Sequence, residues 1–205
     1  IDVGRTPEII QRVDEAGQLG ALKAIAASSV PDPFSTRSLK ILGALIARHE
    51  KRPDDAEQML KAIAEGAADQ QVYGLLADLA EARGDLAGAI QYLEATISIV
   101  GATDYQRVAK LYLKTGDTAK SILNWKKFAE QHGGSFGNEE ALRSLAESGA
   151  DEALAAFFRE AYTSIPVTDP ARQQLAMSMI RINQESGRYD ALIDEVVFTA
   201  DNKAV

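Results

Sequence analysis

The sequence predicts an all-α protein made of stacked helical hairpins, and three observations support this fold class. Two stretches, residues 73–99 and 105–131, can be laid over each other so that similar residues fall at the same offsets. All six prolines lie where predicted helices begin or end, so none interrupts a helical pattern. Aromatic residues make up only 6% of the chain while alanine is abundant, which suits close packing of helices better than a sheet.

The two matching stretches each contain a Gly-Asp pair, and the pairs are 32 residues apart. Gly84 and Gly116 can adopt the left-handed conformation that ends a helix. Asp85 and Asp117 can then cap the following helix and place negative charge at its positive end. A period of about 30 to 35 residues is typical of stacked helical repeats. We therefore expect hairpins whose two helices are joined at these pairs.

Hydrophobic periodicity between the predicted breaks indicates about twelve amphipathic helices in six pairs. In chain order, the pairs are 7–16 with 18–28, 35–50 with 54–65, 69–83 with 86–99, 102–115 with 117–131, 139–148 with 151–163, and 170–186 with 189–200. No sustained alternation of apolar and polar residues predicts a strand.

Prolines and their neighbours indicate where several of these helices start. Thr6-Pro7 and Asp169-Pro170 have the pattern of an N-cap residue followed by proline at the first helical position. The remaining prolines are expected between helices, at Pro31, Pro33, Pro53 and Pro166.

The repeats resemble the tetratricopeptide repeat (TPR), a two-helix unit of 34 residues with the signature Trp-x2-Leu-Gly-x2-Tyr, Ala-x3-Phe and Pro. The copy at 69–100 reads Tyr73-x2-Leu76-Ala77-x2-Ala80, then Ala89-x3-Leu93, and the copy at 102–132 reads Tyr105-x2-Val108-Ala109-x2-Tyr112, then Ser121-x3-Trp125. A fair copy covers 35–66, and degenerate copies cover 1–34, 138–165 and 169–201. The resemblance implies one domain over residues 1–205, a right-handed α-solenoid (a TPR-like superhelix) of about six antiparallel helical hairpins.

Charge and composition exclude several classes of partner. The formal net charge of −8 argues against nucleic acid or an anionic membrane surface, and no apolar stretch is long enough for membrane insertion. The chain has no cysteine, which fits the periplasm and the cytoplasm equally well. Because it starts at Ile1 without an initiator Met, we expect a processed protein or a piece of a larger polypeptide or assembly.

No residue pattern predicts catalysis, a metal site or a cofactor. His49 ends a predicted helix in a charged run, and neither it nor His132 is accompanied by residues at metal-ligand spacing. The Gly-rich segment 132–137 is interpreted as a flexible connector, with Asn138 capping the next helix. An enzymatic alternative would need the His132 segment to meet carboxylates from another hairpin.

The TPR resemblance also implies a concave groove lined by the first helix of each pair. The groove positions fall one, four, eight, eleven and twelve residues after the start of that helix. On the fair copy they include Ala44 and Ala47 beside three cations. The charged groove positions over the chain are Arg37, Lys40, Arg48, Asp78, Glu81, Lys110, Lys114 and Arg181. They form basic, acidic and basic zones, which suit an extended peptide of alternating charge.

The resemblance and the lack of a catalytic pattern lead to one main functional hypothesis. We expect a non-catalytic protein–protein interaction scaffold that binds a segment of a protein or peptide partner in the concave groove. The alternative is a periplasmic TPR segment that acts as a spacer or guide within a larger bacterial secretion or exopolysaccharide-export protein.

Overall fold

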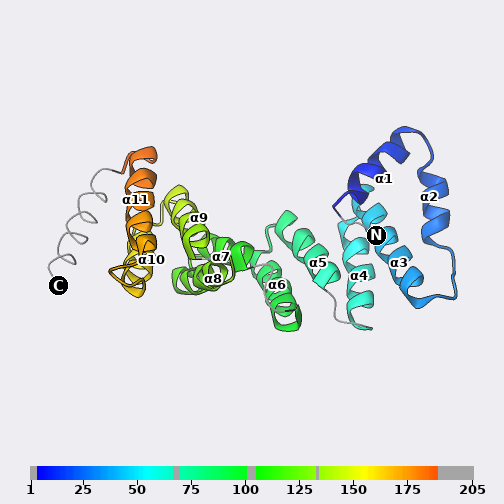
Figure 1. The fold of residues 1–205 in the computed structure, drawn as a ribbon. Helices are drawn as coiled ribbons and strands as arrows, with labels where there is room; N and C mark the ends of the chain where they lie inside the picture. Colours follow the sequence, from blue (N-terminus) through cyan, green and yellow to red (C-terminus); the bar gives the residue numbers. More distant parts are fainter. Residues whose placement is uncertain (1–3, 67–69, 101–104, 133, 189–205) are drawn as a thin grey trace. The chain divides into compact units, whose positions relative to one another are not determined.

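The computed structural model describes residues 4–66, 70–100, 105–132 and 134–188, and these residues are all-α (Figure 1). Eleven helices make up the described chain: α1 (Thr6–Glu15), α2 (Leu19–Ala26), α3 (Pro33–His49), α4 (Pro53–Ala64), α5 (Gln70–Ala82), α6 (Leu86–Val100), α7 (Tyr105–Lys114), α8 (Thr118–Gln131), α9 (Gly134–Glu147), α10 (Asp151–Ser164) and α11 (Pro170–Glu185). The all-α prediction is confirmed. The helix expected at 189–200 lies outside the described residues.

The helices pack as adjacent antiparallel pairs within two compact units, residues 1–103 and 104–205. In the first unit, α3 packs against α4 and α5 against α6, while α4 also contacts α5. In the second unit, α7 packs against α8, and α9 contacts α8, α10 and α11. The expectation of one continuous superhelix over residues 1–205 stays a prediction.

Each hairpin turn contains one residue with a left-handed backbone. Gly84 has φ +77° and Gly116 has φ +82°, as the Gly-Asp pattern predicts. The N–H of Gly84 donates to the carbonyl of Glu81, and the N–H of Asp85 donates to that of Ala80. These bonds satisfy two carbonyls that the end of a helix leaves without intrahelical donors. The same conformation occurs at Gly17, Gly149 and Gly187.

The turn between α3 and α4 uses a lysine where the other turns use glycine. Lys51 has φ +60°, and among the described residues it is the one non-glycine residue with positive φ. The N–H of Lys51 donates to the carbonyl of Arg48, and that of Arg52 donates to that of Ala47. Lys51 therefore occupies the same turn position as the glycines. In this conformation the Cβ of Lys51 lies close to the following carbonyl oxygen, which destabilises the fold by roughly 1–2 kcal/mol.

Aspartates cap four helices. The carboxylates of Asp85, Asp117 and Asp169 accept hydrogen bonds from the N–H groups of Gly88, Lys120 and Ala171, at 2.9, 3.1 and 2.9 Å. All three caps confirm the sequence prediction. A fourth cap, in which Asp32 accepts from the N–H of Ser35 at 2.7 Å, was not predicted.

The structure changes the expected role of three other residues near helix starts. Pro33 and Pro53 are the first residues of α3 and α4, whereas the sequence places them between helices. Proline fits this position because its missing N–H would have no intrahelical partner. Thr6 is inside α1 and the N-cap residue is Arg5, which makes no side-chain cap bond. The prediction of Thr6 as a cap is therefore wrong.

Each unit has its own apolar core. The core of the first unit is formed by α1, α3, α4 and α5, with fully buried Ile41, Leu60 and Leu76 at its centre. The core of the second unit is centred on Trp125, Phe157 and Phe158, none of which is more than 1% exposed. Trp125 thus belongs to the core, as its repeat offset predicts.

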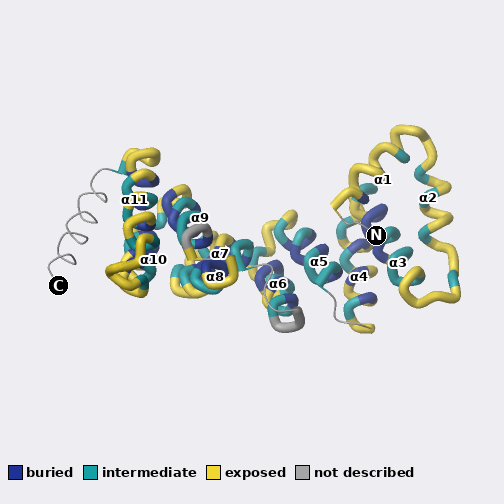
Figure 2. The backbone as a smooth tube through the Cα atoms, in the orientation of Figure 1, coloured by how far each residue is buried: buried dark blue, intermediate teal, exposed yellow. Residues whose placement is uncertain are grey.

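Helix α2 differs from its neighbours because none of its residues is buried (Figure 2). Its sequence, LGALKAIA, is strongly apolar. Leu19, Leu22 and Ala26 pack partly against the core, while Ile25 is 54% exposed. The first hairpin is therefore less covered than the hairpins that follow it in the first unit.

Residues 134–137 of the Gly-rich segment are helical where the sequence predicts a connector. Helix α9 begins at Gly134, so Asn138 lies inside the helix and does not cap it. Close packing of α8 and α9 explains the glycine at position 137, because a Cβ there would overlap the backbone of Ala129. Glycine at this position permits a helix crossing that any other residue would obstruct.

We expect Lys51→Gly to raise the free energy of unfolding of the first unit by about 1 kcal/mol, because glycine adopts the left-handed conformation without strain. Urea denaturation followed by circular dichroism would measure the change. Lys51→Ala is the matched control, because it removes the charged side chain and keeps the Cβ. Equal stability of the two variants would contradict the assignment of strain to this residue.

Gly137→Ala should lower the free energy of unfolding of the second unit by about 1–3 kcal/mol, because the added Cβ forces α8 and α9 apart. Gly134→Ala on the same helix is the control, since its Cβ would meet no atom closer than 3.9 Å. Thermal unfolding of both variants tests this expectation. If the two alanines have the same effect, the helix crossing is not the constraint on this segment.

Candidate functional site

The groove positions on α3 divide into exposed charges and buried alanines. Lys40 and Arg48 are exposed and Arg37 is half-buried. Ala44 and Ala47, at the positions between them, are 1% and 2% exposed and belong to the core of the first unit. The middle of this predicted surface is therefore not open to a partner. Its accessible part consists of the cations toward the two ends of α3.

The next groove helix in the chain, α5, places acidic residues at the groove positions. Asp78 and Glu81 are both half-buried. The Arg48 Nη1 atom lies 3.7 Å from Asp78 Oδ2, and the two side chains are 42% and 36% exposed. A long ion pair in solvent contributes little stability. The structure thus brings a predicted basic position and a predicted acidic position together through a contact that is easily exchanged.

A stronger set of ion pairs joins α4 to the end of α5. The guanidinium of Arg83 donates to Asp54 at 3.0 Å and to Glu57. Glu57 also accepts from Lys61 at 2.8 Å. The hydrogen bond from Lys61, followed by that from Arg83, lowers the pKa of Glu57 below its ordinary value of 4.5. This cluster fixes two neighbouring hairpins to each other and was not predicted from the sequence.

In the second unit, α9 supplies carboxylates to the predicted basic position on α7. Glu140 accepts a hydrogen bond from Gln106 Nε2 at 2.8 Å and lies 3.4 Å from Lys110 Nζ. The Lys110 and Glu140 side chains are 45% and 29% exposed, so this contact also contributes little stability. Lys114 is exposed, and it has no ion pair to any residue in the described part of the chain.

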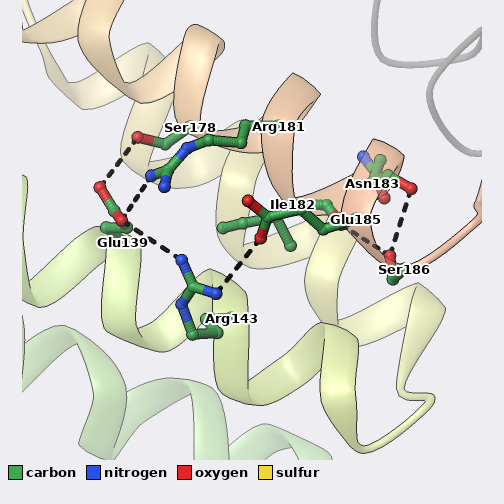
Figure 3. A network of polar contacts seen from close by, with 8 residues as sticks. All are labelled: Glu139, Arg143, Ser178, Arg181, Ile182, Asn183, Glu185 and Ser186. Carbon is green, nitrogen blue, oxygen red and sulfur yellow. Dashed lines mark hydrogen bonds and ion pairs between the residues drawn. The ribbon is translucent and has the colours of Figure 1, made fainter.

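The predicted basic position on α11 is also paired with α9 (Figure 3). Glu139 accepts from Arg181 Nη2 at 2.5 Å and from the Ser178 hydroxyl at 3.2 Å. Arg143 extends the network, with 3.6 Å to Glu139 and 3.3 Å to Glu185. The hydrogen bond from Arg181 is the main cause of a lowered pKa at Glu139. Among the described residues, Arg181 is thus the basic position of the second unit that a short ion pair holds.

The two histidines have structural contacts that explain their positions. His49 Nε2 lies 2.8 Å from Asp14 Oδ2, which links the end of α3 to α1. His132 stacks on Phe128 with ring centroids 4.2 Å apart, and its Nδ1 lies 3.0 Å from the Phe128 carbonyl. Because a carbonyl only accepts, this Nδ1 is the protonated nitrogen. His132 thus covers the C-terminal end of α8.

Within the described residues, His, Asp and Glu do not gather in any group of three or more that could hold a metal ion. Also among these residues, no helix combines the length and apolar character that a membrane span requires. The charged side chains of both units instead either join neighbouring hairpins or lie on the exposed surface. Such an arrangement can make electrostatic contacts with a charged partner.

The amino-acid sequence matches no protein-family model, and no curated protein is significantly similar to it. The fold, however, is similar to a tetratricopeptide repeat protein from Parabacteroides merdae ATCC 43184, with a TM-score of 0.57, 14% identity and coverage of 96% of this chain and 77% of that chain. Two crystal structures of nearly identical TPR-like repeats from Podosopora anserina have TM-scores of 0.47 and identities of 14% and 15%. They match 85% and 86% of this chain and 99% and 100% of theirs.

The paired helices, the left-handed turns and the first of these likenesses define the class of the protein as an all-α helical repeat protein. Its fold is TPR-like over most of the chain.

We expect the free energy of unfolding to decrease at acidic pH, because the Glu57 ion pairs are then lost. The pKa of Glu57 is lowered in the folded chain, so the unfolded chain binds the proton more readily. The contribution is present above about pH 4.5 and is lost as the pH falls through the folded pKa. Glu57→Gln should lower the free energy of unfolding at pH 7 by about 1 kcal/mol and weaken its dependence on pH below 5.

Urea denaturation between pH 3 and pH 7 checks this expectation. Glu65→Gln is the control, because Glu65 is exposed at the end of the same helix and makes no ion pair with a described residue. If both variants keep the wild-type pH dependence, Glu57 is not a source of acid sensitivity.

Proposed function

We propose that this protein is a non-catalytic interaction scaffold that binds a charged segment of a protein partner on the groove helices of its first unit. The observation that carries this proposal is that the exposed cations of α3 make no short ion pair with a described residue. Lys40 has no ion pair to a described residue, and Arg48 has only the long contact to Asp78. In the second unit, Arg181 is held by Glu139, whereas Lys110 has a 3.4 Å contact to Glu140 and Lys114 has no ion pair to a described residue.

A partner carboxylate gains more free energy at a cation that is not already paired within the fold. A partner carboxylate at Lys40 gains a charge contact and breaks none within the described residues. At Arg48 it replaces a solvent-exposed pair, which is worth at most about 1 kcal/mol. At Arg181 it would have to displace a 2.5 Å hydrogen bond from Glu139. Charge-assisted hydrogen bonds of this length are about twice as strong as neutral ones.

The nearby carboxylates define the rest of the partner segment. Asp78 and Glu81 follow on α5, so a segment that passes from α3 to α5 meets positive charge first and negative charge next. An acidic residue followed by a basic one satisfies both. Such charges set the register and the association rate of a complex more than its affinity. Part of the affinity therefore has to come from uncharged contacts of the same segment.

Two other hypotheses from the sequence gain no support from the described residues. The structure adds no observation specific to a spacer or guide within an export protein, so that alternative stays a prediction. The enzymatic alternative needs carboxylates around His132, whereas the contacts of its ring are with Phe128.

We expect Lys40→Glu to weaken binding of the partner segment by about tenfold at low salt, because it places like charge opposite the partner carboxylate. Peptides are first selected on the wild-type chain from a displayed random library, and isothermal titration calorimetry then gives the dissociation constant of each variant. The difference in dissociation constant between wild type and Lys40→Glu should decrease as the ionic strength rises.

Lys51→Glu is the matched control, because it makes the same charge change at an exposed residue just after the same helix. It should leave the dissociation constant within about twofold of wild type, as expected for a charge outside the contact. Equal losses in Lys40→Glu and Lys51→Glu would mean that general charge, and not this face of α3, determines binding.

A further inference from the structure

The second unit has a cleft of about 540 Å³, which lies mainly on helices other than the predicted groove helices. It is formed by α8 and α10, the second helices of their pairs, together with the first residues of α9 and α11 and the connector before α11. None of the predicted groove positions lines it. The volume is within the range of about 300–1,000 Å³ that binding pockets have.

The floor of the cleft is apolar. Five side chains from α8, α10, the connector and α11 form it: Ala129, Phe157, Ala161, Ile165 and Leu175. Phe157 and Leu175 are part of the buried core, so the floor is fixed by packing. Ala161 and Ile165 are half-buried. The small side chains of Ala129 and Ala161 leave space that larger residues would fill, and an apolar group placed there leaves water.

The rim of the cleft carries excess negative charge. Its ionisable residues are Lys126, Glu130, Glu160 and Asp169, three carboxylates and one ammonium group. Lys126 is paired with Glu160. Asp169 caps α11 through one oxygen. Glu130 is exposed and makes no ion pair within the described residues.

Arg172 and Lys127, on α11 and α8, do not offset this charge, because they are directed elsewhere. The Arg172 guanidinium lies over the ring of Tyr162, 4.3 Å from its centroid, and its Nη1 is 3.5 Å from the carbonyl of Ile165. Lys127 lies over Tyr105, 5.3 Å from the ring centroid. Neither residue lines the cleft. The rim therefore presents unbalanced carboxylate charge around an apolar floor.

We infer that this cleft is a second docking site, which takes an apolar side chain next to Lys or Arg in an exposed segment of a partner protein. The apolar side chain fills the space above Ala129 and Ala161, and the neighbouring cation faces Glu130 and Asp169. An apolar centre within a polar, solvent-accessible rim is the usual anatomy of a protein interface. A small ligand is instead fixed by polar groups that converge inside its pocket.

The site is independent of the proposed function in both position and charge. The groove positions of α3 present cations and those of α5 carboxylates, whereas the rim of the cleft carries excess carboxylate charge. One chain can therefore bind a segment of mixed charge and a basic segment on different units. Failure of either assignment leaves the other unchanged.

The test uses three synthetic peptides with the ¹⁵N-labelled full chain. They are Ac-Gly-Lys-Leu-Lys-Gly-NH2, the same peptide with Glu in place of both Lys, and the same peptide with Ser in place of Leu. We expect the Lys-Leu-Lys peptide to shift the backbone amides of residues lining the cleft in a saturable manner. The other two peptides should bind about tenfold more weakly, because each lacks one of the two complementary features. Shifts confined to other residues, no shifts, or equal binding of all three peptides would overturn the proposal.

Two pairs of variants locate the site. Ala161→Trp fills the cleft and should abolish binding, while Ala156→Trp, at an exposed position of α10 outside the cleft, should retain it. If Ala161→Trp does not fold, Glu130→Lys decides the matter. It should weaken binding of the Lys-Leu-Lys peptide and strengthen binding of the Glu-Leu-Glu peptide, whereas Glu147→Lys on the exposed end of α9 should change neither. Unaltered binding in Glu130→Lys contradicts the assignment.

Discussion

The hairpin turns depend on a single backbone conformation, the left-handed residue that ends one helix before the next begins. Five glycines and Lys51 adopt it among the described residues. Because this residue reverses the chain within two or three positions, the following helix must return alongside the first. Antiparallel pairing brings the apolar stripes of the two helices together. The cores of both units, and the charged residues placed around them, follow from where these turns fall.

The helices could be predicted because proline, glycine and aspartate act locally. A glycine after an apolar-periodic stretch and an aspartate after the glycine specify one helix end and the next helix start, whatever the rest of the chain does. The start of α9 could not be predicted in this way. Glycine has a second use, to allow backbones to approach, and Gly137 serves it against Ala129. Only the positions of two helices in space distinguish the two uses.

The repeat offsets propose Lys40, Arg48 and Lys114 as groove residues. All three are exposed, and their role in binding stays a prediction. The offsets also place Ala44 and Ala47 in the groove, although both are buried. Small apolar residues are equally suited to a groove floor and to a helix contact, so their type does not decide between the two.

The carboxylates of α9 and the acidic cleft could not be found from the sequence. Residues 138–165 are a degenerate repeat copy, so no offsets could be applied to Glu139 or Glu140. Ion pairs also depend on side-chain reach between helices, which spacing along one helix does not determine. The cleft combines residues of four helices and a connector, from Lys126 to Leu175. No local pattern predicts that these residues meet.

The ion pairs between hairpins have a consequence for how such a chain can change. Arg83 reaches back 29 residues to Asp54, Lys126 reaches forward 34 residues to Glu160, and Arg181 reaches back 42 residues to Glu139. Within each unit, neighbouring hairpins therefore carry matched charges. Deleting, duplicating or exchanging a hairpin inside a unit would leave these charges without their partners. The order of the hairpins within a unit is thus reflected in their polar contacts as well as in the covalent chain.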